Sequence, residues 1–126
     1  MKEILFISTL VFSCTAFAQN KIPVQFHGLY EGNKATCGRE PIMYDYSDNG
    51  FDIGAEGISG FEEGCGLEKA LSQSELSFTG SFSCGGPDES ETVKVTLTLS
   101  PDKKTITTSS NKSIVAFGNG KYYRCK

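Results

Sequence analysis

The amino-acid sequence predicts an all-β domain, a small antiparallel barrel of about eight strands. The composition supports this fold class: 14 glycines in 126 residues are too many for a helical bundle, and 38% hydrophobic residues are too many for a disordered chain. Several short segments alternate apolar and polar residues with a period of two, and turn signals separate them at regular intervals. A closed barrel leaves no unpaired strand edge, although a two-sheet sandwich is an alternative that fits the same pattern.

Residues 1–18 have the features of a secretory signal peptide, with Lys2 at the front, an apolar stretch, and small residues up to Ala18. Cleavage after Ala18 leaves residues 19–126 as a single domain, because no repeat, linker or change of composition interrupts them. The apolar stretch is shorter than the roughly 20 residues that a helix needs to cross a membrane, so we expect no transmembrane segment. Lipidation of Cys14 after an earlier cut is the alternative.

The first half of the domain contains two predicted strands and a glycine-rich stretch. Residues 25–31 and 41–46 alternate apolar and polar side chains, which predicts a strand in each. In the glycine-rich stretch that follows, every pattern is interrupted, and we expect short twisted strands at residues 51–53 and 58–61.

The segment before residue 75 is ambiguous, whereas the segment after it is a clear strand. Leu67, Ala70 and Leu71 fit one helical turn, and they fit equally well a strand that pairs with the next segment. Residues 75–84 alternate apolar side chains with Ser and Thr, which predicts a strand with one face on the core. Gly80 interrupts the apolar face, as expected for a bend or bulge in a strongly curved sheet.

The last third of the chain reads as two hairpins. Residues 93–99 alternate strictly and form the clearest strand of the sequence. Residues 100–103 place Pro where a type I turn favours it, so residues 105–108 are the returning strand. We expect residues 113–117 and 121–125 to form the final hairpin, because the Asn-Gly pair between them tolerates the backbone of a tight turn.

Four cysteines remain after removal of the signal segment, an even number in an oxidising compartment, which predicts two disulfides. We expect Cys65 to pair with Cys84, because they flank neighbouring segments joined by a short connection. Cys125 on the last strand is then expected to reach Cys37, in the loop after the first strand, as closure of a barrel requires. A zinc site is the alternative, but the cysteines are widely spaced and form no C-x-x-C pair, so we expect no metal site.

Several short features occur in a characteristic order, and they are Gly28-Leu29-Tyr30, Cys37, Glu62 shortly before Cys65, Cys84-Gly85-Gly86, and Tyr123-Arg124-Cys125. In this order they resemble small exported bacterial proteins with a lipocalin-like barrel and no assigned function. The resemblance implies that fold and a periplasmic or secreted location. The chain is also similar in size and compartment to the periplasmic inhibitors of C-type lysozyme. It matches their Ser-Gly-x-x-Tyr loop at Ser59-Gly60, but Glu63 stands where the Tyr would be.

Charge and motif content argue against several functions. Twelve basic and fifteen acidic residues give a net charge of −3, which disfavours a nucleic-acid binder that relies on a basic face. His27 is the single histidine, no Gly-x-Ser-x-Gly elbow is present, and no set of acid, base and nucleophile emerges, so we expect neither an enzyme nor a cofactor.

Residues 45–56 superficially resemble a calcium-binding loop, with Glu56 at the twelfth position. Asp52 occupies the eighth position, which normally carries an aliphatic residue, and the flanking sequence reads as strand. We therefore expect a hairpin turn at Asn49-Gly50 and no tight calcium site.

We expect specificity to lie in surface loops, because the strongest sequence signals serve folding. The preferred hypothesis is a non-enzymatic envelope module that binds a protein partner or acts as an inhibitor. Phe61 is either an aromatic anchor rimmed by carboxylates or, equally consistent with the sequence, a residue of the core. The candidate binding residues are Ile58, Phe61, Glu62 and Glu63 in one loop, and Asp88 and Glu89 in another. The alternative is a carrier of a small apolar ligand, whose pocket would be lined by Phe26, Tyr30, Phe78 and Phe82.

Overall fold

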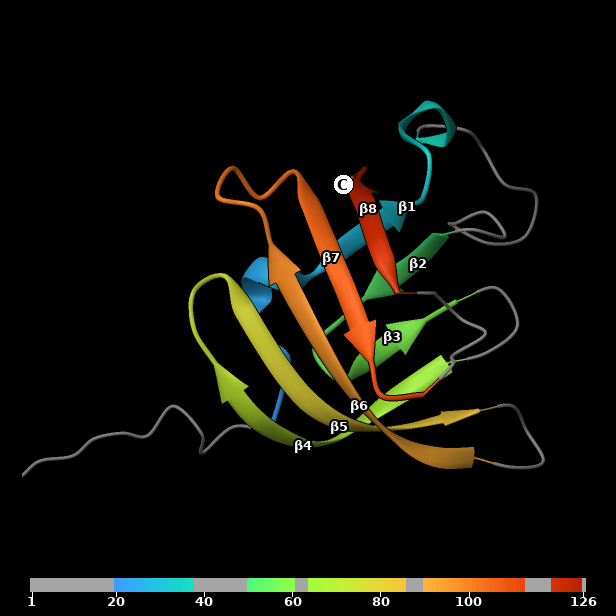
Figure 1. Ribbon diagram of the computed structural model, residues 1–126, viewed down its shortest axis with the longest axis vertical. Helices are drawn as coiled ribbons and strands as arrows, with labels where there is room; N and C mark the ends of the chain where they lie inside the picture. Colours follow the sequence, from blue (N-terminus) through green and yellow to red (C-terminus); the bar gives the residue numbers. More distant parts are fainter. Residues whose placement is uncertain (1–19, 38–49, 61–63, 86–89, 113–118, 126) are drawn as a thin grey trace, which may run out of the picture.

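The computed structural model describes residues 20–37, 50–60, 64–85, 90–112 and 119–125 of the chain. Eight strands form a closed antiparallel barrel in which each strand pairs with the next and β8 pairs with β1 (Figure 1). The predicted fold class is therefore confirmed. The strands are β1 Gly28–Glu31, β2 Gly50–Ile53, β3 Gly57–Ser59, β4 Gly64–Gln73, β5 Ser77–Gly85, β6 Ser90–Leu99, β7 Thr105–Ser110 and β8 Gly120–Arg124.

The long strands β5, β6 and β7 form where the sequence alternates most regularly. Their apolar residues point inward, with Phe78 opposite Leu97 and Leu99 opposite Ile106. Most of their Ser and Thr residues point outward, whereas Thr108 on β7, opposite Leu97, is buried. The turn between β6 and β7 contains Lys103 at a φ of 62°, a left-handed conformation that is uncommon outside glycine. The predicted strands and the predicted turn at residues 100–103 are all present.

Strand β4 resolves the ambiguity between a helical turn and a strand. Its register against β5 slips twice, between Leu67 and Lys69 and between Ala70 and Ser72, so two residues of β4 oppose one of β5 at each slip. Each such bulge inserts one residue, which lengthens the spacing of inward-facing positions from two to three. Leu67, Ala70 and Gln73 therefore face the same side, a spacing that imitates a helix.

The first predicted strand begins later than expected. Residues 25–27 do not belong to β1, because the chain forms a short 3-10 helix, η2 Val24–Phe26, after Pro23. A second 3-10 turn, η3 Lys34–Thr36, follows β1. No helix within the described ranges is long and apolar enough to cross a membrane.

Several sequence-based predictions fall outside the described residues. They concern the signal segment at 1–18, the strand at 41–46, and the segment 113–117, which was expected to pair with residues 121–125. In the structure the neighbours of β8 are β7 and β1.

Both predicted disulfides are present. Cys37 pairs with Cys125 at a Cα–Cα distance of 5.3 Å, and Cys65 pairs with Cys84 at 4.0 Å. Cys65 and Cys84 lie directly opposite each other in the β4–β5 ladder, and both side chains point into the barrel. The first bridge ties the end of the last strand to the segment after the first strand, where the barrel closes.

Candidate functional site

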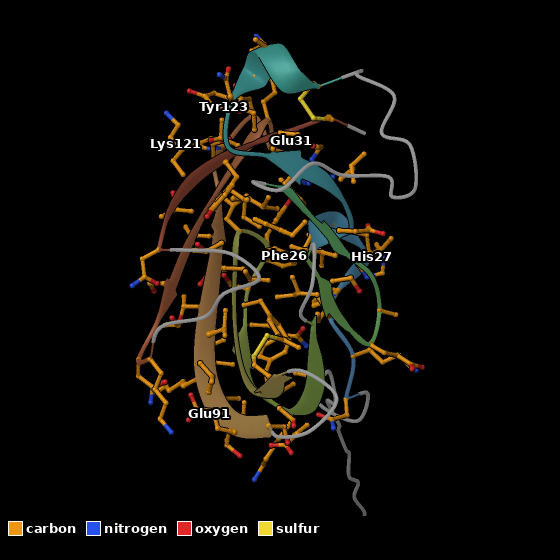
Figure 2. All side chains as sticks on the ribbon, turned by 90° about the vertical axis from the view of Figure 1, so that its right-hand side faces the viewer. Phe26, His27, Glu31, Glu91, Lys121 and Tyr123 are labelled. Carbon is orange, nitrogen blue, oxygen red and sulfur yellow. A yellow bond between two sulfur atoms is a disulfide. The ribbon has the colours of Figure 1, made fainter. Side chains whose placement is uncertain are left out.

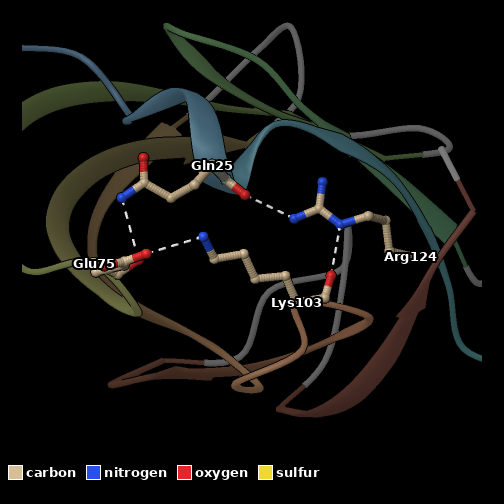
Figure 3. A network of polar contacts seen from close by, with 4 residues as sticks. All are labelled: Gln25, Glu75, Lys103 and Arg124. Carbon is tan, nitrogen blue, oxygen red and sulfur yellow. Dashed lines mark hydrogen bonds and ion pairs between the residues drawn. The ribbon is translucent and has the colours of Figure 1, made fainter.

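One end of the barrel is closed by a network around Arg124, on the last strand (Figure 3). The Arg124 guanidinium donates hydrogen bonds to three backbone carbonyl oxygens, those of Gln25 at 2.7 Å, His27 at 2.6 Å and Lys103 at 2.9 Å. The Gln25 amide donates to the Glu75 carbonyl, and the Lys103 ammonium forms an ion pair with the Glu75 carboxylate at 3.0 Å. This network joins η2, the β4–β5 turn, the β6–β7 turn and β8.

Arg124 also lies over the ring of Tyr30, with its guanidinium carbon 5.1 Å from the ring centroid. The Tyr30 hydroxyl donates to the Phe26 carbonyl oxygen at 2.9 Å. Burial raises the pKa of Tyr30 to about 12, and the positive charge of Arg124 opposes part of that rise. Tyr30 therefore stays neutral at physiological pH and acts as a hydrogen-bonded part of the closed end.

The inner side of the barrel is packed with side chains. The four residues proposed for a carrier pocket, Phe26, Tyr30, Phe78 and Phe82, are each 0% exposed. Phe78 has its ring centroid 6.1 Å from that of Phe26 and 6.5 Å from that of Phe82, and Tyr30 stacks on Phe51 at 5.5 Å. These rings fill the interior by contacting one another, as expected for a barrel of eight strands.

The segment that leads into η2 is attached to β4. The Asn20 amide donates to the Glu68 carbonyl at 2.7 Å and accepts from the Ala70 backbone N–H at 2.6 Å. These two backbone groups lie at the bulges of β4, where the regular ladder to the neighbouring strand is interrupted. Asn20 therefore satisfies backbone groups at the bulges, two residues after the predicted cleavage point.

The opposite end of the barrel brings the two candidate binding loops together. Ser59, Gly64, Gly85 and Ser90 are cross-strand partners in one row, and they are the last or first residues of β3, β4, β5 and β6. The β3–β4 and β5–β6 connections therefore leave the barrel side by side. Phe61, Glu62, Glu63, Asp88 and Glu89 lie in these connections, outside the described residues.

Ile58, the remaining candidate binding residue, is part of the core. It is 1% exposed and its cross-strand partners are the inward-facing Ile53 and Cys65. The alternation along β3 turns its side chain into the core.

An open hollow of about 440 Å³ lies against β2, β3 and β4. Four glycines, Gly54, Gly57, Gly64 and Gly66, line it together with Asp52, Ile58, Ser59 and Cys65. The spacing of these glycines is visible in the sequence, but the sequence does not reveal that Gly57 on β3 and Gly64 and Gly66 on β4 meet beside Gly54, which lies between β2 and β3.

His27 and Glu56 have structural partners. The His27 ring nitrogen Nε2 lies 2.7 Å from the Ile22 carbonyl oxygen, and the Glu56 carboxylate forms an ion pair with the Lys21 ammonium at 3.0 Å. Gly50 to Ile53 form a strand where a calcium loop would continue, and residues 45–49 lie outside the described ranges. Within those ranges no three His, Cys, Asp or Glu side chains gather as metal ligands.

The Arg124 network was not predicted from the sequence. Its partners are backbone carbonyl groups, which every residue possesses, so no pattern of side chains reveals them. The one available signal was an arginine on the last strand beside a cysteine, and it has no specific spacing to its partners. Comparison of the chain with known protein families, with curated proteins and with solved structures finds no match in any of the three.

Proposed function

We propose that this protein is an exported, non-enzymatic binding module that recognises a protein partner through the loops at the end of the barrel opposite the Arg124 network. The proposal rests on one observation, the row of cross-strand partners formed by Ser59, Gly64, Gly85 and Ser90. Because these residues end or begin their strands, the β3–β4 and β5–β6 connections leave the barrel side by side. Loops held by a rigid scaffold are the usual place of recognition.

The packed interior supports recognition on the outside of the barrel. A carrier would need an apolar cavity, whereas Phe26, Tyr30, Phe78 and Phe82 contact one another or their neighbours and are fully buried. The polar network around Arg124 closes the opposite end. These features favour a loop surface over an internal pocket.

Export agrees with the presence of two disulfides in the fold. All four cysteines after residue 18 are paired in two disulfides, and disulfides persist in oxidising compartments such as the periplasm. The proposal therefore includes a periplasmic or secreted location.

The loop proposal is tested with residues 19–126 immobilised and exposed to a periplasmic extract. We expect Phe61→Ala to abolish retention of a polypeptide that the wild type retains, with an unchanged melting temperature, because Phe61 is the proposed anchor. Glu75→Gln, at the closed end, is the matched control and should retain the polypeptide. If Phe61→Ala instead lowers the melting temperature by several degrees, Phe61 is a packing residue and the anchor assignment is wrong.

Native mass spectrometry of the same domain tests the carrier alternative. A small molecule that co-purifies at one per chain, and that is lost on Phe82→Ala, would contradict the loop proposal. We expect the mass measured for the native domain to equal that of the polypeptide alone.

A further inference from the structure

The outer face of β5, β6 and β7 has an unusual composition. Because side chains alternate along a strand, the positions between the buried ones point outward, and eleven of these thirteen positions carry a hydroxyl group. We call this surface the hydroxyl face. Its hydroxyl-bearing residues are Ser77, Thr79, Ser81, Ser83, Ser90, Thr92, Thr96, Thr98, Thr105, Thr107 and Ser109.

The charges on and beside the hydroxyl face are mostly positive. Lys69, Ser81 and Lys94 lie in one row across β4, β5 and β6, so the two lysines bracket a serine. Two strand spacings separate their backbones by about 10 Å. In the row formed by Ser77, Thr98 and Thr107, the next position on β8 is Lys121.

Three lysines elsewhere in the protein are paired with carboxylates, whereas these three, like Lys34 and Lys104, form no such ion pair among the described residues. The ammonium groups of Lys21, Lys103 and Lys112 form ion pairs with glutamates. Among the described residues no such ion pair involves Lys69, Lys94 or Lys121, all of which are exposed. Figure 2 shows Lys121 pointing away from the barrel. Glu68 is the acidic neighbour on β4, and it accepts a hydrogen bond from Thr92 at 3.4 Å.

We propose that the hydroxyl face, with Lys69, Lys94 and Lys121, is a docking surface for an acidic polysaccharide. A hydroxyl group both donates and accepts hydrogen bonds, and a sugar chain offers both along its length. Ammonium groups that form no ion pair among the described residues, and that are separated by neutral hydroxyl positions, complement a polymer whose carboxylates are separated by neutral ring atoms. The face is positive on a chain of net charge −3, so the complementarity is local.

Other polyanions fit this face less well. Single-stranded nucleic acids need several aromatic side chains on which successive bases stack, and the outward positions of β5, β6 and β7 carry none. Tyr123 on β8, opposite Thr105, is a single ring beside the face, and the Lys121 ammonium lies 6.0 Å from its centroid. A membrane surface requires apolar side chains that enter the acyl boundary, and these outward positions carry none of those either. The hydroxyl face therefore favours a hydrated, flexible polymer that can follow a curved sheet.

The test uses residues 19–126 in gels that contain polygalacturonate, a polymer with one carboxylate and two hydroxyls per sugar. We expect the polymer to retard the wild type and the neutral polymer dextran to retard it much less. Lys69→Gln/Lys94→Gln should weaken retardation about tenfold, as expected for two exposed charges, and added salt should weaken it as well. Lys34→Gln, on η3, is the matched control and should behave as the wild type.

The hydroxyl contribution is tested separately with Thr98→Val/Thr107→Val, which keeps the shape of a cross-strand pair and replaces two hydroxyls with methyl groups. We expect weaker binding to polygalacturonate and unchanged binding to polyacrylate, which has carboxylates but no hydroxyls. The proposal is overturned if the wild type is not retarded, if Lys34→Gln weakens binding as much as the double lysine variant, or if polyacrylate binds the wild type as strongly as polygalacturonate. Failure of the Phe61 experiment leaves this outcome unaffected, because the Phe61→Ala substitution changes no residue of the hydroxyl face and neither Lys69 nor Lys94 nor Lys121.

Discussion

Arg124 is the single side chain on which the closed end depends. It reaches carbonyl oxygens that belong to residues nearly one hundred positions earlier in the chain and to the β6–β7 turn. Each bond is charge-assisted, and the planar guanidinium offers its donors in fixed directions. A lysine would keep the charge but could not reach three carbonyl groups in this geometry.

Replacing this side chain with an apolar one of similar length tests its role. We expect Arg124→Met to lower the free energy of unfolding by about 3 kcal/mol, because three partly buried carbonyl oxygens lose their donor. Denaturant titration monitored by circular dichroism measures the change. Lys121→Met, on the same strand and exposed, should change the free energy by less than about 0.5 kcal/mol, and an equal loss in both variants would contradict the role of the network.

Tyr30 makes the stability of the fold sensitive to alkaline pH. Its pKa is about 12 in the folded protein and about 10 in the unfolded chain, so between these values the unfolded state releases the phenolic proton first. The contribution of Tyr30 to the free energy of unfolding is therefore complete below pH 10. It falls by roughly 2 to 3 kcal/mol as the pH approaches 12. Tyr30→Phe should show a flatter decline over this interval in denaturant titrations, and parallel curves for the two proteins would contradict the prediction.

Among the elements, β4 shows most clearly what the sequence predicts and what it conceals. Strands β5 and β6 were predictable because a regular ladder leaves a period of two in the sequence, and β7 was predictable because β-branched residues follow the turn at residues 100–103. The bulges of β4 replace that period with three, and the same residues then read equally well as a helical turn. At the other end of the barrel, the candidate loops could be named from the sequence, but the pairing of their strand ends could not, because register is a property of partners far apart in the chain.

Gly57 and Gly66 face each other on β3 and β4 and allow a matched comparison. A Cβ at Gly57 would clash with the Cys65 carbonyl oxygen, a backbone atom, whereas a Cβ at Gly66 meets nothing within 4 Å. We expect Gly57→Ala to lower the free energy of unfolding by at least about 2 kcal/mol, since backbone must move. Gly66→Ala should leave stability unchanged or raise it by about 0.5 kcal/mol. Thermal unfolding of the two variants distinguishes them, and similar melting temperatures would be evidence against this account.

At the scale of the whole molecule, the two disulfides stabilise the fold by limiting the conformational entropy of the unfolded chain. The bridges span 88 and 19 positions of sequence, and loop-closure estimates give about 4.6 and 3 kcal/mol respectively. The pairing was predictable because a closed barrel brings its first and last strands together, which fixes the partner of the last cysteine.

Cys37→Ala/Cys125→Ala should therefore lower the free energy of unfolding by up to about 4.6 kcal/mol. Peptide mapping of the non-reduced protein provides the covalent check, and a bridge between Cys37 and Cys65 would contradict both the pairing and the stability prediction. Denaturant titration of the protein with and without the Cys37–Cys125 bridge measures the difference in the free energy of unfolding.

The long bridge also determines how the molecule would respond to mechanical tension. The Cys37–Cys125 bond provides a short covalent path between the two ends of the described chain and bypasses residues 38–124. Force applied at the ends would extend only residues 20–37, about 60 Å of chain, whereas a chain without the bridge could extend to roughly 370 Å. All strands except β1 lie within the bypassed segment. Tension applied to the oxidised protein would detach the first strand and its 3-10 turn, while β2 to β8 stay outside the direct path of the force.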